Sequence, residues 1–378
     1  MMSEMKVLTT AQKEEWKTLL DRCAPFDFYH LPEYHALAEE EGEGQARLFH
    51  FAADGCTVVL PLLLRSLHSL VPSAEVPSAP QGQDGWRDAT SVYGYPGPVC
   101  SDPNISEALL CRFHAALTRC LRELGVVSVF SRLHPLLPQR MLLAGLGECV
   151  PLNQTVSVDL TLTPEAQLAQ YRKSHRTRIN KMRRAGMTCV RDVDGRYLAE
   201  FIDIYHETMR RVGAHERYFF APSYFCRLWQ TLGSHLHLFA GLVHGRPVCA
   251  GLFLECHGIL QYHLGGTVNA ALQLSPMTYL LNEVSQWATQ QGLRVFHLGG
   301  GTTAQPDDSL LHYKWGFSDR RHCFSIWRWV LLPEIYEALC TAKARLDQDK
   351  QLRPTSAGFF PAYRCPTAPE ASHDLLPV

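Results

Sequence analysis

The stretch that decides the fold begins at Tyr262-His263-Leu264-Gly265-Gly266 and ends at Leu298-Gly299-Gly300-Gly301. Both runs read as strand ends, and the chain between them contains an amphipathic helix that starts at Ser275-Pro276 and stops at Gly292. Serine is a favoured helix cap, proline suits the first helical position, and glycine often ends a helix. Glycine at both strand ends lets another group approach the backbone closely. We therefore expect a strand, helix, strand unit with a site at its glycine-rich edge.

A single lysine follows this unit within an apolar and aromatic run, Leu310-Leu311-His312-Tyr313-Lys314-Trp315-Gly316-Phe317. Aromatic neighbours lower the local dielectric and so strengthen the field of a charged group. The alternative is a surface lysine whose stem packs along an aromatic core, as long side chains often do. We expect any chemistry of this chain at Lys314.

The same order of elements occurs in both halves of the chain. In the second half, strands at 236–243, 248–254 and 259–264 precede the helix, and another strand follows it. In the first half, a hairpin that turns at Asp54-Gly55 precedes a helix that ends at Gly125, and a strand follows at once. The sequence therefore predicts an α+β fold with two tandem domains, each a mostly antiparallel sheet flanked by helices.

Length and composition agree with two globular domains. The chain has 378 residues, of which 46% are hydrophobic and 19% are charged. This length exceeds one ordinary core, and this composition is typical of soluble proteins. We predict a first domain at 1–152, a second at 153–333, and a C-terminal helix with a Pro-rich tail at 334–378.

Charge and hydropathy limit the possible partners and location. The formal net charge of −1 gives no global attraction to nucleic acid or membrane, so such binding requires a local patch. The N-terminal residues lack the apolar core of a signal peptide, and no run approaches the roughly 20 apolar residues of a membrane span. We expect a cytoplasmic protein without a transmembrane segment.

Cysteine and histidine are frequent, but their spacing does not indicate a metal site. The 13 cysteines include no C-x-x-C pair, and the 18 histidines form no H-E-x-x-H motif. We therefore expect buried thiols and no metal.

A helix predicted from Thr163-Pro164 onward becomes strongly basic. Its second part contains no acidic residue and seven cations: Arg172, Lys173, Arg176, Arg178, Lys181, Arg183 and Arg184. An apolar stripe that includes His175 and Ile179 lies at helical spacing and should pack inward. The cations could form a solvated face, but such faces usually mix both signs because like charges repel. We favour a phosphate-bearing partner.

Polar and aromatic residues also gather near a strand end of the first half. Arg132 and His134 follow the strand that begins at Val126, and Tyr95 lies in the run Tyr93-Gly94-Tyr95-Pro96-Gly97-Pro98. Arg132 could pair with a carboxylate and His134 could fill a polar corner of the core. Equally, both could bind a ligand.

The order of elements resembles the GNAT acyltransferase fold, and two such units in tandem resemble the FemABX peptidyltransferases and their FemAB-like relatives. The resemblance covers nearly the whole chain. It is carried by residues 92–98, 130–135, 175–179 with Gly186, 205–211 with 218–219, 262–266, 298–300 and 313–317.

This resemblance implies an aminoacyltransferase that moves an acyl group, in the best-known members an amino acid from aminoacyl-tRNA, onto an amine of a peptidoglycan or other envelope precursor. It implies no metal, no other cofactor and no covalent enzyme intermediate. The family's lysine corresponds to Lys314, and the arginine after its long helix corresponds best to Arg211, with Arg210 as the competing register.

Attack of an amine on an acyl ester needs proximity and a positive charge for the oxyanion, and Lys314 can supply the charge. Arg211, Arg132 and His134 are the expected substrate-binding residues, since arginine suits phosphate and carboxylate groups. Tyr95, Tyr218 and Tyr262 are expected to line the site, although aromatic residues at such spacing are more often core. Arg172, Lys173, Arg176, Arg178 and Lys181 are expected to bind tRNA phosphates.

Two other functions remain open at the level of sequence. An acyl-CoA-dependent N-acyltransferase would share the fold, but it would hold pyrophosphate with a glycine-rich turn before the main helix, and residues 269–276 contain no glycine. A non-catalytic RNA-binding or envelope-assembly module would use the basic helix as its only active surface.

Overall fold

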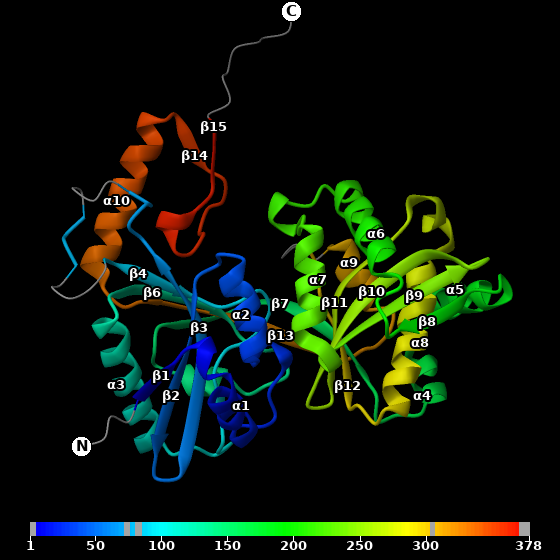
Figure 1. Cartoon of the computed structure of the whole chain (residues 1–378), viewed down its shortest axis with the longest axis horizontal. Helices are drawn as coiled ribbons and strands as arrows, with labels where there is room; N and C mark the ends of the chain where they lie inside the picture. The colour runs from blue at the N-terminus through cyan, green and yellow to red at the C-terminus, as the bar shows by residue number, and fades with distance from the viewer. Residues whose placement is uncertain (1–4, 72–75, 80–84, 303–306, 370–378) are drawn as a thin grey trace, which may run out of the picture. The chain divides into compact units, whose positions relative to one another are not determined.

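A computed structural model of the chain describes residues 5–71, 76–79, 85–302 and 307–369 (Figure 1). The chain forms two compact units. The first unit combines residues up to Cys23 with Ala38–Val150 and the chain from Ser325 onward. The second unit combines Ala24–Leu37 with Pro151–Phe324. The fold class is mixed α+β, as predicted.

The first unit is built on a sheet in the order β1-β2-β3-β4-β6-β13, with β5 paired to β3. Neighbouring strands are antiparallel except β4 and β6, which are parallel. The strands are β1 Met5–Leu8, β2 Gln45–Ala53, β3 Cys56–Ser66, β4 Arg87–Thr90, β5 Val99–Cys100, β6 Val126–Arg132 and β13 Arg321–Val330. The helices are α1 Lys13–Arg22, α3 Glu107–Glu123 and α10 Pro333–Asp349, and a short ladder joins β14 Leu352–Pro354 to β15 Thr367–Pro369.

Helix α3 connects the parallel strands β4 and β6, as the sequence predicts for the first half. The Ser106 side chain caps the helix by accepting a hydrogen bond from the Leu109 amide at 3.3 Å. Phe113, Leu117 and Leu121 bury one helix face in a core with the strands, and each such side chain contributes roughly 1.5–3 kcal/mol when it leaves water. Gly125 has φ 69°, so the chain can leave the helix and enter β6 directly.

The C-terminal segment closes over β3, β4 and β6. The Asp88 carboxylate is fully buried and accepts hydrogen bonds from Arg65 Nε at 2.8 Å and from Arg364 Nε at 2.5 Å. One residue earlier, the buried Tyr363 hydroxyl lies 2.6 Å from Ser128 Oγ. Tyr363 and Arg364, which follow α10, are therefore part of the first unit's core.

The second unit is built on a sheet in the order β7-β12-β11-β10-β9-β8, in which only β11 and β12 are parallel neighbours. The strands are β7 Glu148–Asp159, β8 Thr188–Asp192, β9 Leu236–Val243, β10 Arg246–Cys256, β11 Ile259–Thr267 and β12 Val295–Gly300. The helices are α4 Pro164–Gln170, α5 Lys173–Arg184, α6 Leu198–Arg211, α7 Pro222–Leu232, α8 Pro276–Gln290 and α9 Ser309–Lys314. Helix α2, Pro32–Glu40, belongs to this unit up to Leu37 and to the first unit from Ala38.

The predicted meander and the helix after it are both present. Strands β9, β10 and β11 are consecutive antiparallel neighbours, and α8 begins with Pro276 at its first position. Leu280, Leu281 and Val284 bury the inner face of α8. Ser275 holds the N-cap position, but it has φ 52° and its side chain makes no capping hydrogen bond, so the cap expected from the sequence does not form.

The basic helix is shorter than the sequence predicts. Thr163 caps α4 as expected, with its hydroxyl accepting from the Ala166 amide at 3.3 Å. Tyr171 and Arg172 then adopt extended ψ angles of 142° and 146°. The Arg172 amide donates to the Gly316 carbonyl at 2.8 Å, which fixes the break, and α5 starts anew at Lys173.

The N-terminal segment Ala24–Leu37 belongs to the second unit. Its Asp27 carboxylate accepts from the Gln261 side chain at 2.6 Å, and Gln261 Oε1 lies 2.5 Å from His297 Nδ1. All three side chains are buried. The sequence predicts continuous domains at 1–152 and 153–333. In the structure, each compact unit instead combines segments that are far apart in the sequence. Within the described residues, no helix is both long and apolar enough to cross a membrane.

Candidate functional site

The candidate site lies where the parallel strands β11 and β12 stop pairing. Their ladder joins Ile259 to Val295, Leu260 to Phe296 and Gln261 to His297, and then it ends. Beyond His297 a register shift carries β12 onward along β7. We call this place the ladder end. The residues that follow it belong to the two glycine-rich runs, at 262–266 and 298–301.

Lys314 reaches the ladder end from the C-terminus of α9. Its side chain is buried, with 6% of the residue surface exposed, and Nζ donates to the Gly300 carbonyl at 2.7 Å. The ammonium also lies 5.7 Å from the centre of the Tyr262 ring. Burial lowers the pKa of Lys314 to about 8, while the Asp308 carboxylate acts in the opposite direction and raises it. Lys314 is therefore not a surface lysine, because its charged group is inside the unit.

Asp308 is a neighbour of Lys314 that our sequence reasoning missed. Its Oδ1 accepts from the Leu311 amide at 2.8 Å and so caps α9, while its Oδ2 accepts from the Thr302 amide at 2.8 Å. Any side chain at Gly301 would collide with this carboxylate. The signal was available, since aspartate before a short apolar helical run is a common N-cap.

The glycines at the end of β11 make room for the protein's own side chains. A side chain at Gly265 would strike the Tyr262 hydroxyl. A Cβ at Gly266 would lie 2.6 Å from Thr208 Oγ1 and 2.8 Å from the Ile204 carbonyl, both on α6. The glycine pattern predicts that this space admits another group close to the backbone. In the structure, α6 and Tyr262 fill it.

Tyr262 directly follows the last residue of β11 that pairs with β12, and Tyr313 directly precedes Lys314 on α9. Burial raises the pKa of both phenols, so both hydroxyls remain protonated hydrogen-bond donors. The Tyr313 hydroxyl lies 3.3 Å from Thr278 Oγ1 in the first turns of α8. This contact links α9 to the start of α8.

Arg211 lies at the C-terminus of α6 and is exposed. Its guanidinium donates to the Thr267 carbonyl at 2.9 Å and to Asn269 Oδ1 at 2.6 Å, which anchors it at the end of β11. Both acceptors are neutral, so the positive charge of Arg211 is not balanced by them. The backbone carbonyl of Tyr218 accepts from the Tyr205 hydroxyl at 2.7 Å, and the Tyr218 side chain is partly buried.

Arg172, at the N-cap of α5, and the cations of the helix itself give it a basic surface, which we call the α5 face. Arg172, Lys173, Arg176 and Lys181 are exposed, and Arg178 is partly buried. Among the described residues, no carboxylate lies within ion-pair distance of any of these five cations. Arg183, also on α5, lies 4.0 Å from the Glu283 carboxylate. Helix α5 packs on α8 and on the 3-10 turn Asn269–Leu274 that leads into α8. Positive charge thus lies beside the start of α8.

His175 joins the α5 face to the segment that carries Lys314. Its ring Nε2 lies 2.9 Å from the Tyr313 carbonyl, and a side chain at Gly316 would collide with the ring. Burial lowers the pKa of His175 to about 4, so the ring is neutral at physiological pH and Nε2 donates the hydrogen bond. His175 is a packing residue, in agreement with its place in the apolar stripe of the sequence.

The candidate residues of the first half form a separate cluster within the first unit. The His134 ring lies 6.2 Å from the Tyr95 ring, and its backbone amide donates to Gln139 Oε1 at 2.6 Å. Gln139 also donates to the Pro96 carbonyl, which fixes the turn that carries Tyr95. The Arg132 guanidinium lies 6.0 Å from the Phe130 ring. Tyr95 and His134 are thus brought together, as part of a locally satisfied corner.

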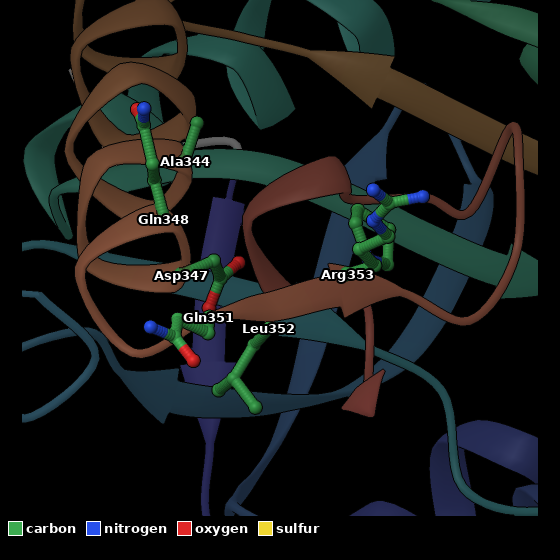
Figure 2. Close-up of a pocket in the computed structure, with 7 residues that line it drawn as sticks. Ala344, Asp347, Gln348, Gln351, Leu352 and Arg353 are labelled. Carbon is green, nitrogen blue, oxygen red and sulfur yellow. The ribbon is translucent and has the colours of Figure 1, made fainter. Parts of the chain in front are cut away.

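A surface pocket occurs elsewhere in the first unit, between the end of α10 and β14 (Figure 2). Ala344, Asp347 and Gln348 line it from α10, and Leu352 and Arg353 line it from the following strand. The Asp347 carboxylate is already paired with Lys343 one helical turn earlier. This pocket contains none of the candidate residues.

Residues 169–314 match the family model of the acetyltransferase (GNAT) domain. The chain is also similar to solved structures over most of its length. A FemX crystal structure is 14% identical in sequence and superposes with a TM-score of 0.66. The match covers 88% of this chain and 99% of the FemX chain. The chain has the GNAT acyltransferase fold.

Two further structures share this GNAT fold at low identity. The C-terminal domain of a putative lysylphosphatidylglycerol synthetase from Agrobacterium fabrum is 15% identical, with a TM-score of 0.52 and coverage of 90% of this chain and 98% of its own. L-PGS from Bacillus licheniformis is 14% identical, with a TM-score of 0.53 and coverage of 83% and 90%. No curated protein sequence matches the chain. The matched GNAT region runs from the start of the α5 face to Lys314, and the predicted resemblance is thus confirmed for the fold.

Proposed function

We propose that this protein is a FemAB-like acyltransferase that forms an amide by transferring an acyl group, aminoacyl from tRNA, to an amine of a cell-wall or envelope precursor. The observation that carries the proposal is the buried ammonium of Lys314 at the ladder end. A buried cation is costly unless it is paired and hydrogen-bonded, and Lys314 Nζ donates its hydrogen bond to the neutral Gly300 carbonyl. A developing oxyanion is the charge that such a group stabilises best.

In the proposed reaction, the acceptor amine attacks the acyl carbonyl, forms the C–N bond and leaves a tetrahedral oxyanion. Lys314 Nζ has three N–H donors, of which one is directed to Gly300, so the others are available to the oxyanion. When the intermediate collapses, the ester C–O bond breaks and the amine's proton passes to the departing oxygen. The Tyr262 ring, whose centre lies 5.7 Å from Nζ, is proposed to orient the acyl part.

The α5 face supports a donor that carries phosphates. Cations without carboxylate partners repel one another, and a phosphate backbone relieves that repulsion. Arg211 adds positive charge at the end of β11. We assign Arg172, Lys173, Arg176, Arg178 and Lys181 to the donor, and Arg211 with Tyr218 to the substrate near Lys314. Arg132, His134 and Tyr95 of the first unit are likewise proposed as substrate-binding residues.

A second candidate is an acyl-CoA-dependent N-acyltransferase, which the match of residues 169–314 to the acetyltransferase (GNAT) domain family favours. The start of α8 fits this donor less well. The turn before it contains no glycine, and the residue that takes a left-handed conformation there is Ser275. A side chain at that position occupies space that a pyrophosphate would need beside the backbone amides.

Parallel assays with the two donors test the proposal. Labelled aminoacyl-tRNA and labelled acyl-CoA are each incubated with the protein and a panel of envelope precursors and free amines, and calorimetric titration with acetyl-CoA is run alongside. We expect amide formation from aminoacyl-tRNA and no heat from acetyl-CoA. Transfer from acyl-CoA alone would replace the first candidate by the second. Absence of transfer from both donors, with RNA binding retained, would favour a non-catalytic module.

A further inference from the structure

Two cysteine thiols meet in the first unit where β5 pairs with β3. The sulfur atoms of Cys56 and Cys100 lie 3.6 Å apart. Cys56 is the first residue of β3, and the register places Cys100 opposite Val58. Cys56 and Cys100 are therefore diagonal neighbours on one face of the ladder. A disulfide needs a sulfur to sulfur distance of about 2.05 Å and closer backbones than diagonal neighbours usually have, so the bond closes only if one strand moves toward the other.

Strand β5 can supply this movement. It has only two residues, Val99 and Cys100, and it pairs with β3 alone, outside the main strand order. Just beyond it, Ser101 continues the contact with β3, since its amide donates to the Thr57 carbonyl at 2.9 Å and its hydroxyl accepts from the Thr57 amide at 2.9 Å. These bonds keep Cys100 beside Cys56 while the short strand adjusts.

A third thiol, Cys23, lies near this pair and has a different partner. Its Sγ donates to the Thr57 carbonyl at 3.5 Å, and only 1% of the residue is exposed. Cys56 is 5% exposed, whereas Cys100 is partly exposed. Cys100 is therefore the thiol that a small oxidant reaches first, and Cys56 is the thiol in contact with it.

We propose that Cys56 and Cys100 form a redox modification site that closes into an intramolecular disulfide. With glutathione disulfide as the oxidant, the Cys100 thiolate attacks one sulfur and displaces one glutathione thiolate. The Cys56 thiolate then attacks the Cys100 sulfur of the mixed disulfide and displaces the second. The two cysteines lose two electrons and two protons, and one glutathione disulfide becomes two glutathiones.

Closure ties the start of β3 to the chain that follows the Tyr95 turn. The bond removes conformational freedom from the unfolded chain between the two cysteines, so the oxidised protein should unfold at a higher temperature than the reduced protein. Burial raises the pKa of the Cys100 thiol to about 12, so little thiolate is present at neutral pH. Exchange is consequently slow, and the site is best measured at equilibrium.

To test this, the folded full-length protein is incubated for many hours in glutathione redox buffers. Free thiols are then trapped with an alkylating reagent in denaturant. Peptide mass spectrometry identifies which cysteines are linked. We expect a Cys56–Cys100 cross-link in the wild type and in Cys23→Ser, its loss in Cys100→Ser, and its reversal by dithiothreitol. The thermal midpoint should rise on oxidation in the first two proteins only.

The exposed thiols Cys111 and Cys226 control for the oxidant, because they should accept glutathione singly. If these two are modified while Cys56 and Cys100 stay reduced, the proposal is wrong. It is equally wrong if Cys23, rather than Cys100, is the partner linked to Cys56.

Discussion

Among individual residues, Asp308 has a direct effect on the pKa of Lys314. Burial disfavours the charged form of Lys314, and the Asp308 carboxylate opposes this effect. Because the folded pKa, about 8, lies below the ordinary value of 10.5, the unfolded chain binds more protons between these two pH values. The contribution of Lys314 to stability is therefore lowest below pH 8, where the buried group is charged, and it rises with pH across that window.

Asp308→Asn should lower the pKa of Lys314 further while leaving α9 capped, since asparagine is also a good N-cap. The pKa can be followed by the chemical shift of the lysine Cε carbon in a pH titration of the labelled protein. Asp307→Asn, at an exposed neighbouring position, is the matched control. An unchanged or raised Lys314 pKa in Asp308→Asn would contradict the electrostatic link.

Gly316 tests the contact between His175 and the Lys314 segment. Gly316→Ala places a methyl group against the His175 ring and should destabilise the protein by roughly 1–3 kcal/mol, as overpacking does. His175→Ala opens that space, so the double variant should be more stable than the sum of the two single effects predicts. Denaturant unfolding measures all four proteins. Strict additivity would show that the ring and the glycine do not constrain each other.

At the scale of the element, α5 combines a packing stripe with an unbalanced basic face. Charge reversal by Arg176→Glu with Lys181→Glu should weaken RNA binding and flatten its salt dependence, because each lost phosphate contact removes about one released counterion. Binding is measured by fluorescence anisotropy from low to moderate salt. Lys350→Glu, exposed on the first unit, is the control variant. Unchanged binding and an unchanged salt slope would remove the main support for a tRNA donor.

The elements also show what the sequence could and could not predict. Hydrophobic periodicity and terminal glycines located α3, α8 and the β9–β11 meander, because these signals are local. The break between α4 and α5 was missed, since it is fixed by a hydrogen bond from Arg172 to Gly316, which is remote in sequence. Asp308 was missed for another reason, because its cap precedes a helix of only six residues. The glycines were located correctly, but only the structure shows that α6 and Tyr262 fill the space they leave.

At the scale of the whole molecule, each unit is completed by a segment from a distant part of the chain. Residues Ala24–Leu37 enter the second unit, and the chain from Ser325 onward completes the first. Hydrophobic periodicity could not predict these long-range contacts. No local sequence pattern indicates that Asp27 contacts Gln261 or that Arg364 contacts Asp88.

The ion pair between Arg364, which follows α10, and Asp88 predicts a large effect on the stability of the first unit. Arg364→Ala leaves the buried Asp88 carboxylate with one fewer charged donor and should cost roughly 1.5–3 kcal/mol. Lys350→Ala, at an exposed position on the same unit, should change stability by less than about 0.5 kcal/mol. Chemical denaturation compares the two variants. Equal stability of both variants would show that the tail is not part of the core.

We propose above that the buried Lys314 ammonium stabilises the oxyanion during acyl transfer. The most direct measurement compares transfer from labelled aminoacyl-tRNA by the wild type, Lys314→Ala and the control Lys350→Ala, with circular dichroism to confirm that each variant is folded. Loss of one oxyanion-stabilising donor costs about 10²–10³ in rate. We predict a loss of at least this size in Lys314→Ala and none in Lys350→Ala. A folded Lys314→Ala protein that transfers at the wild-type rate would contradict the claim.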